Sequence, residues 1–138
     1  MSIQVDLRKI GMIRIMKASA GSGKTYNLAK TYISLLLSNE DRYAYRHILA
    51  VTFTNKATAE MKQRILSQLY GIGHGLEESA SYLEKVKEFL PDKFTESTIK
   101  ENALKALNLI LNDYSHFRIE TIDSFFQRVL RGLARELQ

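Results

Sequence analysis

The chain has 138 residues, of which 45% are hydrophobic and 25% charged, an ordinary composition for one globular domain. It has no cysteine, which excludes disulfides, thiolate metal sites and cysteine nucleophiles, and its three histidines show no metal-ligand spacing. No apolar run is long enough to span a membrane and no signal peptide opens the chain, so we expect a cytoplasmic protein with no membrane partner.

The net charge of +5 is unevenly distributed. Residues 1–70 contain eleven Lys and Arg against four Asp and Glu, whereas residues 71–116 contain five against eight. A basic segment of this kind is typical of proteins that bind nucleotides or nucleic acids. A basic surface that serves only solubility would have the same composition.

Residues 1–11 show no clear pattern, and we expect them to form a leader. A short strand-like run at 12–17 then precedes Ala-Ser-Ala-Gly-Ser-Gly-Lys-Thr at 18–25, and a helical pattern covers 25–38. Strand, glycine-rich loop and helix are the context of a phosphate-binding loop of the form G-x-x-x-x-G-K-[ST], here with Ala in the first place. The sequence therefore predicts a nucleoside triphosphate site.

Each residue type in this loop has a physical role. Glycines let the backbone N–H groups curl around a phosphate, Lys24 would contact the β- and γ-phosphates, and the Thr25 hydroxyl would bind Mg²⁺. We take Lys24 and Thr25 as the catalytic candidates. The candidate nucleotide-binding residues are Ala20, Gly21, Ser22, Gly23, Lys24, Thr25 and Tyr26.

A second segment with chemistry follows the apolar run at 47–53, which predicts a buried strand of a parallel sheet covered on both faces. A helix is expected over 56–70, with Gly71, Gly73 and Gly75 ending it. Ligands of open α/β sheets bind where such a strand turns into its helix, and hydroxyl, amide and aromatic groups there suit phosphates and unpaired bases. The candidates are Thr52, Phe53, Thr54, Asn55 and Lys56. In the alternative interpretation Asn55 is only a helix N-cap and Phe53 a core residue.

Residues 76–116 are acidic and predict two helices, around 79–90 and 96–112, separated by Pro91. We interpret them as a helical insertion into an α/β domain. A third strand is expected at 118–122, and the last helix is expected to begin after Asp123 and to run to the chain end.

That last helix predicts two faces. Its start supplies further candidate DNA contacts, namely Thr121, Ser124, Phe125 and Arg128. One face is apolar and expected to point inward (Phe126, Val129, Leu130, Leu133 and Leu137), and the other carries Arg128, Arg131 and Arg135. An arginine stripe can follow a phosphate backbone, but it can equally be a solvated face or pack against a neighbouring domain. Because the chain ends inside this helix with three strands supplied, we expect it to be the N-terminal part of a larger protein.

These segments together resemble the N-terminal part of the UvrD/Rep/RecB class of superfamily 1 DNA helicases. Motif I is matched at 18–25, motif Ia by Ile48 to Ala57 and on through Met61, and a later DNA-contact motif by Thr121-Ile122-Asp123-Ser124-Phe125. The Lys-Ala-Ser-Ala-Gly-Ser-Gly-Lys-Thr form is closer to the RecB/AddA helicase–nuclease branch. Asp123 stands where many relatives carry His, and we interpret it as the N-cap of the last helix.

The resemblance implies a partial RecA-like P-loop NTPase domain, with a parallel sheet flanked by helices. In that frame residues 1–75 are the first part of domain 1A, residues 76–116 begin a 1B-like insertion, and residues 117–138 return to 1A. It further implies that the parent protein binds ATP and Mg²⁺, moves on single-stranded DNA in repair or recombination, and has the rest of the helicase and a partner subunit as partners.

ATP hydrolysis in this class requires an Asp-Glu pair at a strand end. The segments ending at Asp113 and Asp123 imitate it without supplying the pair, so we expect these 138 residues alone to lack activity. Two alternatives stay open at this point. The chain could be a small P-loop kinase that uses Asp123, or a non-catalytic module that binds nucleic acid or protein.

Overall fold

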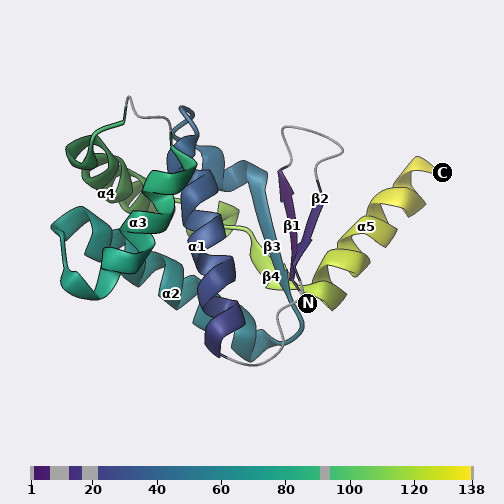
Figure 1. The fold of residues 1–138 in the computed structure, drawn as a ribbon. Coiled ribbons are helices and arrows are strands. Elements are labelled where there is room, and N and C mark those ends of the chain that lie inside the picture. Colours follow the sequence, from purple (N-terminus) through teal and green to yellow (C-terminus); the bar gives the residue numbers. More distant parts are fainter. Residues whose placement is uncertain (1, 7–12, 17–21, 91–93, 138) are drawn as a thin grey trace.

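The computed structural model describes residues 2–6, 13–16, 22–90 and 94–137, with side-chain surroundings given from Tyr26 onward. Within these ranges a four-stranded sheet packs against helices (Figure 1). The strands are β1 (Ser2–Asp6), β2 (Ile13–Met16), β3 (Ile48–Thr52) and β4 (Ile119–Thr121). The helices are α1 (Ser22–Ser38), α2 (Asn55–His74), α3 (Ala80–Phe89), α4 (Glu96–Asn112) and α5 (Ile122–Glu136), and short 3₁₀ turns are η1 (Ala44–His47), η2 (Glu77–Ser79) and η3 (Tyr114–His116).

The sheet has the strand order β2-β1-β3-β4. β3 and β4 are parallel, but β1 runs antiparallel to both of its neighbours. The α/β class is thus confirmed, whereas a sheet that is parallel throughout is wrong. The expected leader is also wrong, because residues 2–6 form β1. A signal was available there: Ile3 and Val5 alternate with polar residues at the period of a strand.

The core lies between the helices and β3, all five residues of which are buried, as their unbroken apolar run predicts. α3 packs on α1 and α4 packs on α2, so the acidic stretch 76–116 shares this core. Its assignment as an inserted region stays a prediction. The buried residues come from every helix up to α4 and include Leu28, Tyr32, Ile33, Met61, Ile65, Leu69, Tyr82, Val86, Ile99, Ala103 and Ile110.

The second helix is longer than its glycines suggest. Gly71 lies inside α2, which ends at His74 and is followed by a left-handed C-cap at Gly75, where φ is +68°. Gly71 is needed for a different reason: a Cβ there would overlap the side chain of buried Ser79. Glycine inside a helix can therefore mark close packing rather than a helix end, which sequence alone does not distinguish.

Asp113 joins two distant turns. Its carboxylate accepts hydrogen bonds from the Tyr45 hydroxyl at 2.6 Å and from Arg46 Nε at 2.7 Å, and its other oxygen lies 2.6 Å from His116 Nδ1. Hydrogen bonds from Tyr45 and His116, together with the Arg46 guanidinium, hold the pKa of the Asp113 carboxyl well below its usual range. The network ties η1, which leads into β3, to η3, which leads into β4.

The last helix departs from expectation. Its apolar residues are exposed rather than inward, from 41% for Val129 to 88% for Leu137. In Figure 1 α5 leads away from the strands on the side opposite α1 to α4. The pattern correctly predicts an amphipathic helix, but the described part of the chain supplies no surface that buries its apolar face.

Candidate nucleotide and nucleic-acid site

Three helix N-termini gather at one end of the molecule. Figure 1 draws the first turns of α1, α2 and α5 at its lower end, where β3 and β4 end. Each N-terminus exposes backbone N–H groups that have no partner within the helix, and each carries the positive end of a helix dipole. This end of the fold is therefore suited to anions, as is common for the carboxyl edge of open α/β sheets.

The start of α1 bears on the predicted phosphate loop. β2 is formed as expected, and α1 begins at Ser22, so Ser22, Gly23, Lys24 and Thr25 form its first turn. The side chains of these four residues, and Ala20 and Gly21 altogether, lie outside the described part of the structure. Their role as nucleotide contacts stays a prediction.

Tyr26 lies half-buried beside α3. Its hydroxyl shares a hydrogen bond with Ser81, its ring meets Tyr82 edge-on at 4.8 Å, and Lys30 Nζ lies 3.9 Å from the ring centroid. These contacts anchor the start of α1 to α3. A nucleotide contact by Tyr26 would come in addition to this packing.

The turn from β3 into α2 presents most of its predicted residues to solvent. Phe53 is 53% exposed, so the alternative that it is a core residue is wrong. Thr54, rather than Asn55, is the N-cap of α2, because its hydroxyl accepts a hydrogen bond from Ala57 N at 3.0 Å. Asn55 and Lys56 are therefore exposed first-turn residues.

Thr52 differs from its neighbours in this turn. It is 4% exposed, and its hydroxyl lies 2.6 Å from that of Thr58. Its side chain therefore holds the turn in shape, and its role as a DNA contact stays a prediction.

The turn from β4 into α5 lies beside the turn from β3 into α2. The parallel register of the two strands pairs Thr52 with Thr121. Thr121 caps α5 by accepting a hydrogen bond from Ser124 N at 3.3 Å, so the expectation that Asp123 is the cap is wrong. Asp123 occupies the first turn of α5, where the positive end of the helix dipole stabilises its carboxylate.

Arg128, one turn further along α5, is already engaged. Its guanidinium forms an ion pair with Glu120 of β4 and lies 5.9 Å from the Phe125 ring centroid. All three arginines of the stripe, Arg128, Arg131 and Arg135, are exposed to solvent, and Arg128 is paired with the Glu120 carboxylate.

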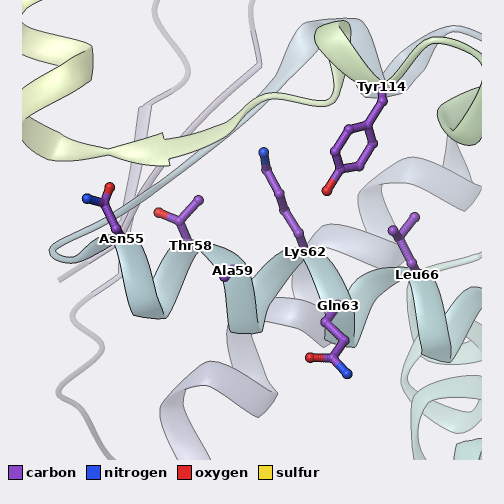
Figure 2. A pocket seen from close by; sticks show the side chains of 7 residues that line it. All are labelled: Asn55, Thr58, Ala59, Lys62, Gln63, Leu66 and Tyr114. Carbon is purple, nitrogen blue, oxygen red and sulfur yellow. The ribbon is translucent and has the colours of Figure 1, made fainter.

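A groove lies beside this site, and apart from Asn55 its lining residues were not among the sequence candidates (Figure 2). It has a volume of about 470 Å³, is lined by one face of α2, and is bounded by Tyr114 of η3. Lys62 Nζ lies 5.0 Å from the centroid of the Tyr114 ring. No spacing signal joins Tyr114 to α2 in the sequence, because the two meet only in the fold.

Comparison with known proteins decides the family. The family model of the UvrD/REP helicase N-terminal domain matches residues 6–138. The chain belongs to the UvrD/REP helicase family. It is 32% identical to the RecBCD enzyme subunit RecB of Buchnera aphidicola over 130 residues, which cover 86% of the chain and 10% of that protein.

Other relatives agree with this assignment. The RecB subunit of Escherichia coli is 32% identical over 126 residues, covering 85% of the chain and 10% of that protein, and DNA helicase II of Salmonella typhimurium is 52% identical over 61 residues, covering 44% and 8%. The chain thus spans about a tenth of the length of the relatives it matches. No solved structure shows a significant match.

The family confirms the resemblance drawn from the three motifs and disfavours the small-kinase alternative. Among the described residues no group of three or more acidic or histidine side chains could hold a metal ion. None of the described helices combines the length and apolar character needed to cross a bilayer.

Proposed function

We propose that this chain forms the ATP-phosphate-binding segment and part of the single-stranded DNA surface of a cytoplasmic ATP-dependent DNA helicase or helicase–nuclease that acts in DNA repair or recombination. One observation carries the proposal. The parallel pairing of β3 with β4 sets Thr52 opposite Thr121, which brings two polar segments from distant parts of a UvrD/REP-family chain to one edge. Because the RecB relatives are by name subunits of the RecBCD enzyme, a partner subunit is part of the proposal.

For ATP, the start of α1 fits the predicted loop. The first four N–H groups of a helix that begins at Ser22 have no intrahelical partner, and they belong to the predicted phosphate-binding residues. In this proposal Lys24 contacts the phosphates and Thr25 holds Mg²⁺. Bound Mg·ATP would supply the free energy of phosphoryl transfer to the motor.

For DNA, the exposed ring of Phe53 offers a stacking surface for an unpaired base. The first turns of α2 and α5 would face the phosphates, with Asn55, Lys56, Ser124 and Phe125 as contacts. Thr52 and Thr121 would position these turns, the former by its buried hydrogen bond and the latter as an N-cap.

The proposal does not include ATP hydrolysis by these 138 residues alone. Asp113 is engaged by Tyr45 and Arg46, away from the β3–α2 turn, and Asp123 lies in the first turn of α5. Neither forms the strand-end Asp-Glu pair that would position magnesium and water.

Two binding measurements test the proposal. A fluorescein-labelled 15-nucleotide oligothymidylate should bind in anisotropy titrations at low salt, and Phe53→Ala should weaken binding about tenfold, since base stacking is worth about 1–3 kcal/mol per base. Phe89→Ala is the matched control, because Phe89 is also an exposed phenylalanine but ends α3. Equal losses in both variants would contradict the DNA assignment.

A fluorescent ATP analogue should bind in the presence of Mg²⁺, and Lys24→Ala should abolish its binding. DNA-stimulated ATP hydrolysis by the 138 residues, lost in Lys24→Ala, would refute the statement that they lack activity alone.

A further inference from the structure

The groove beside the β3–α2 turn is formed by one face of α2 and the ring of Tyr114. The α2 residues that line it recur every three or four positions and so share one helix face: Asn55, Thr58, Ala59, Lys62, Gln63 and Leu66. Tyr114 approaches this face from η3, with its ring over Lys62 and Leu66 in Figure 2. The volume of about 470 Å³ lies within the range of about 300–1,000 Å³ usual for pockets that take small-molecule-sized groups.

Tyr114 is held in place from behind. The residue is 45% exposed, the centroid of its ring lies 5.9 Å from that of buried Phe117, and its backbone carbonyl accepts a hydrogen bond from Phe117 N at 3.0 Å. The preceding residue, Asp113, is fixed by Tyr45 and Arg46. An aromatic face held at the wall of a groove is pre-organised to stack on a planar ligand.

Lys62 is the single charged residue among those that line the groove. It forms no salt bridge with any carboxylate in the described part of the chain. Two other cations that lie over rings are paired, Arg46 with Asp113 and Lys85 with Glu88, whereas Lys30 over Tyr26 resembles Lys62 in having no salt bridge within the described residues. Lys62 therefore keeps its charge available for an anion.

The groove continues directly from the proposed DNA surface. Asn55 belongs to both, and Phe53 lies two residues before it. From Asn55 to Lys62 the helix axis rises by about 10 Å at 1.5 Å per residue. A stacked strand, which rises about 3.4 Å along its axis for each nucleotide, would cover this distance in about three nucleotides.

We propose that this groove is a separate binding site for one nucleotide of a single DNA strand, with a base stacked on Tyr114 and a phosphate on Lys62. The inference rests on the proposed single-stranded DNA binding and extends it to residues outside the three motifs. The exposed amide of Asn55 supplies hydrogen-bonding groups that any base or sugar can use, so the site would read no particular sequence.

The test uses the same oligothymidylate at several salt concentrations. Tyr114→Leu should weaken binding about tenfold, while Tyr114→Phe should bind like the unaltered chain because stacking needs the ring and not the hydroxyl. Lys62→Gln should lower the slope of log affinity against log salt by about 0.7, the value for one phosphate contact on a single strand. The matched controls are Tyr70→Leu, which changes an exposed tyrosine of α2 outside the groove lining, and Lys105→Gln on α4; neither should change binding.

Photo-crosslinking tests the contact with Tyr114 directly and complements the affinity measurements. Oligothymidylate that carries 5-iododeoxyuridine should photo-crosslink to Tyr114, as located by mass spectrometry, and the crosslink should disappear in Tyr114→Leu. Circular dichroism and thermal unfolding establish that this variant remains folded.

The outcomes separate the two proposals. If the oligonucleotide binds and Phe53→Ala weakens it, while the Tyr114 and Lys62 variants bind normally and no crosslink forms at Tyr114, the groove is refuted and the proposed function stands. If the oligonucleotide does not bind at all, both are refuted.

Discussion

Thr52, the last residue of β3, lies opposite Thr121, the last residue of β4, in a parallel register. Each strand passes at once into a helix with a threonine N-cap, Thr54 for α2 and Thr121 for α5. Two short polar segments thus become one surface because strand pairing fixes their relative position. The predictions below examine the packing and charges that maintain this arrangement.

The N-cap of α2 should make a measurable contribution to the free energy of unfolding. Thr54→Ala removes the acceptor for Ala57 N, and we expect a loss of about 1 kcal/mol in the free energy of unfolding. Thr54→Ser keeps a hydroxyl and should lose much less. Urea denaturation measures both, and an equal loss in the two variants would show that the methyl group, not the cap, matters.

Two helical glycines should respond oppositely to alanine. A Cβ at Gly71 overlaps Ser79, so Gly71→Ala should cost about 1–3 kcal/mol through overpacking. No atom lies within 4 Å of a Cβ at Gly132 in α5, so Gly132→Ala should raise helicity and stabilise by up to about 1 kcal/mol. Thermal unfolding followed by circular dichroism compares them, and similar shifts in both variants would contradict the close contact of α2 with η2.

The Asp113 network predicts an acid-sensitive contribution to stability. Because the pKa of Asp113 is lowered in the folded chain, this contribution is fully present above the ordinary aspartate pKa of about 3.9 and is lost as pH falls toward the lower folded value. Asp113→Asn should therefore lower the Tm at pH 7, and the gap to the unaltered chain should narrow below about pH 4.

Glu101→Gln serves as the control for Asp113→Asn, because within the described residues the ion pair of Glu101 is an exposed one with Lys105. Its Tm should follow that of the unaltered chain at every pH. A gap for Asp113→Asn that stays constant from pH 7 to pH 3 would rule out the network as its source.

Removing the ion pair between Glu120 and Arg128 should raise the affinity of the chain for DNA. Glu120→Gln removes a negative charge beside the proposed DNA surface and frees the guanidinium, so oligothymidylate should bind severalfold more tightly at low salt. The gain should vanish in the double variant with Arg128→Gln. An unchanged affinity in the single variant would place Arg128 off the DNA path.

Sequence alone was sufficient for what depends on local pattern. The strand at Ile13–Met16, the helix from Ser22, the buried strand Ile48–Thr52 and the later helical stretches could be predicted because apolar period and turn residues act over a few positions. The family followed from the same short motifs.

Tertiary structure alone decided the relations between distant segments. It inserted β1 between β2 and β3 in the opposite direction, set Thr52 beside Thr121, and placed Tyr114 over Lys62. It also left the apolar face of α5 exposed, which the helix period cannot reveal because amphipathicity states that a face is apolar but not what covers it. Such relations depend on long-range pairing and packing, and no local spacing encodes them.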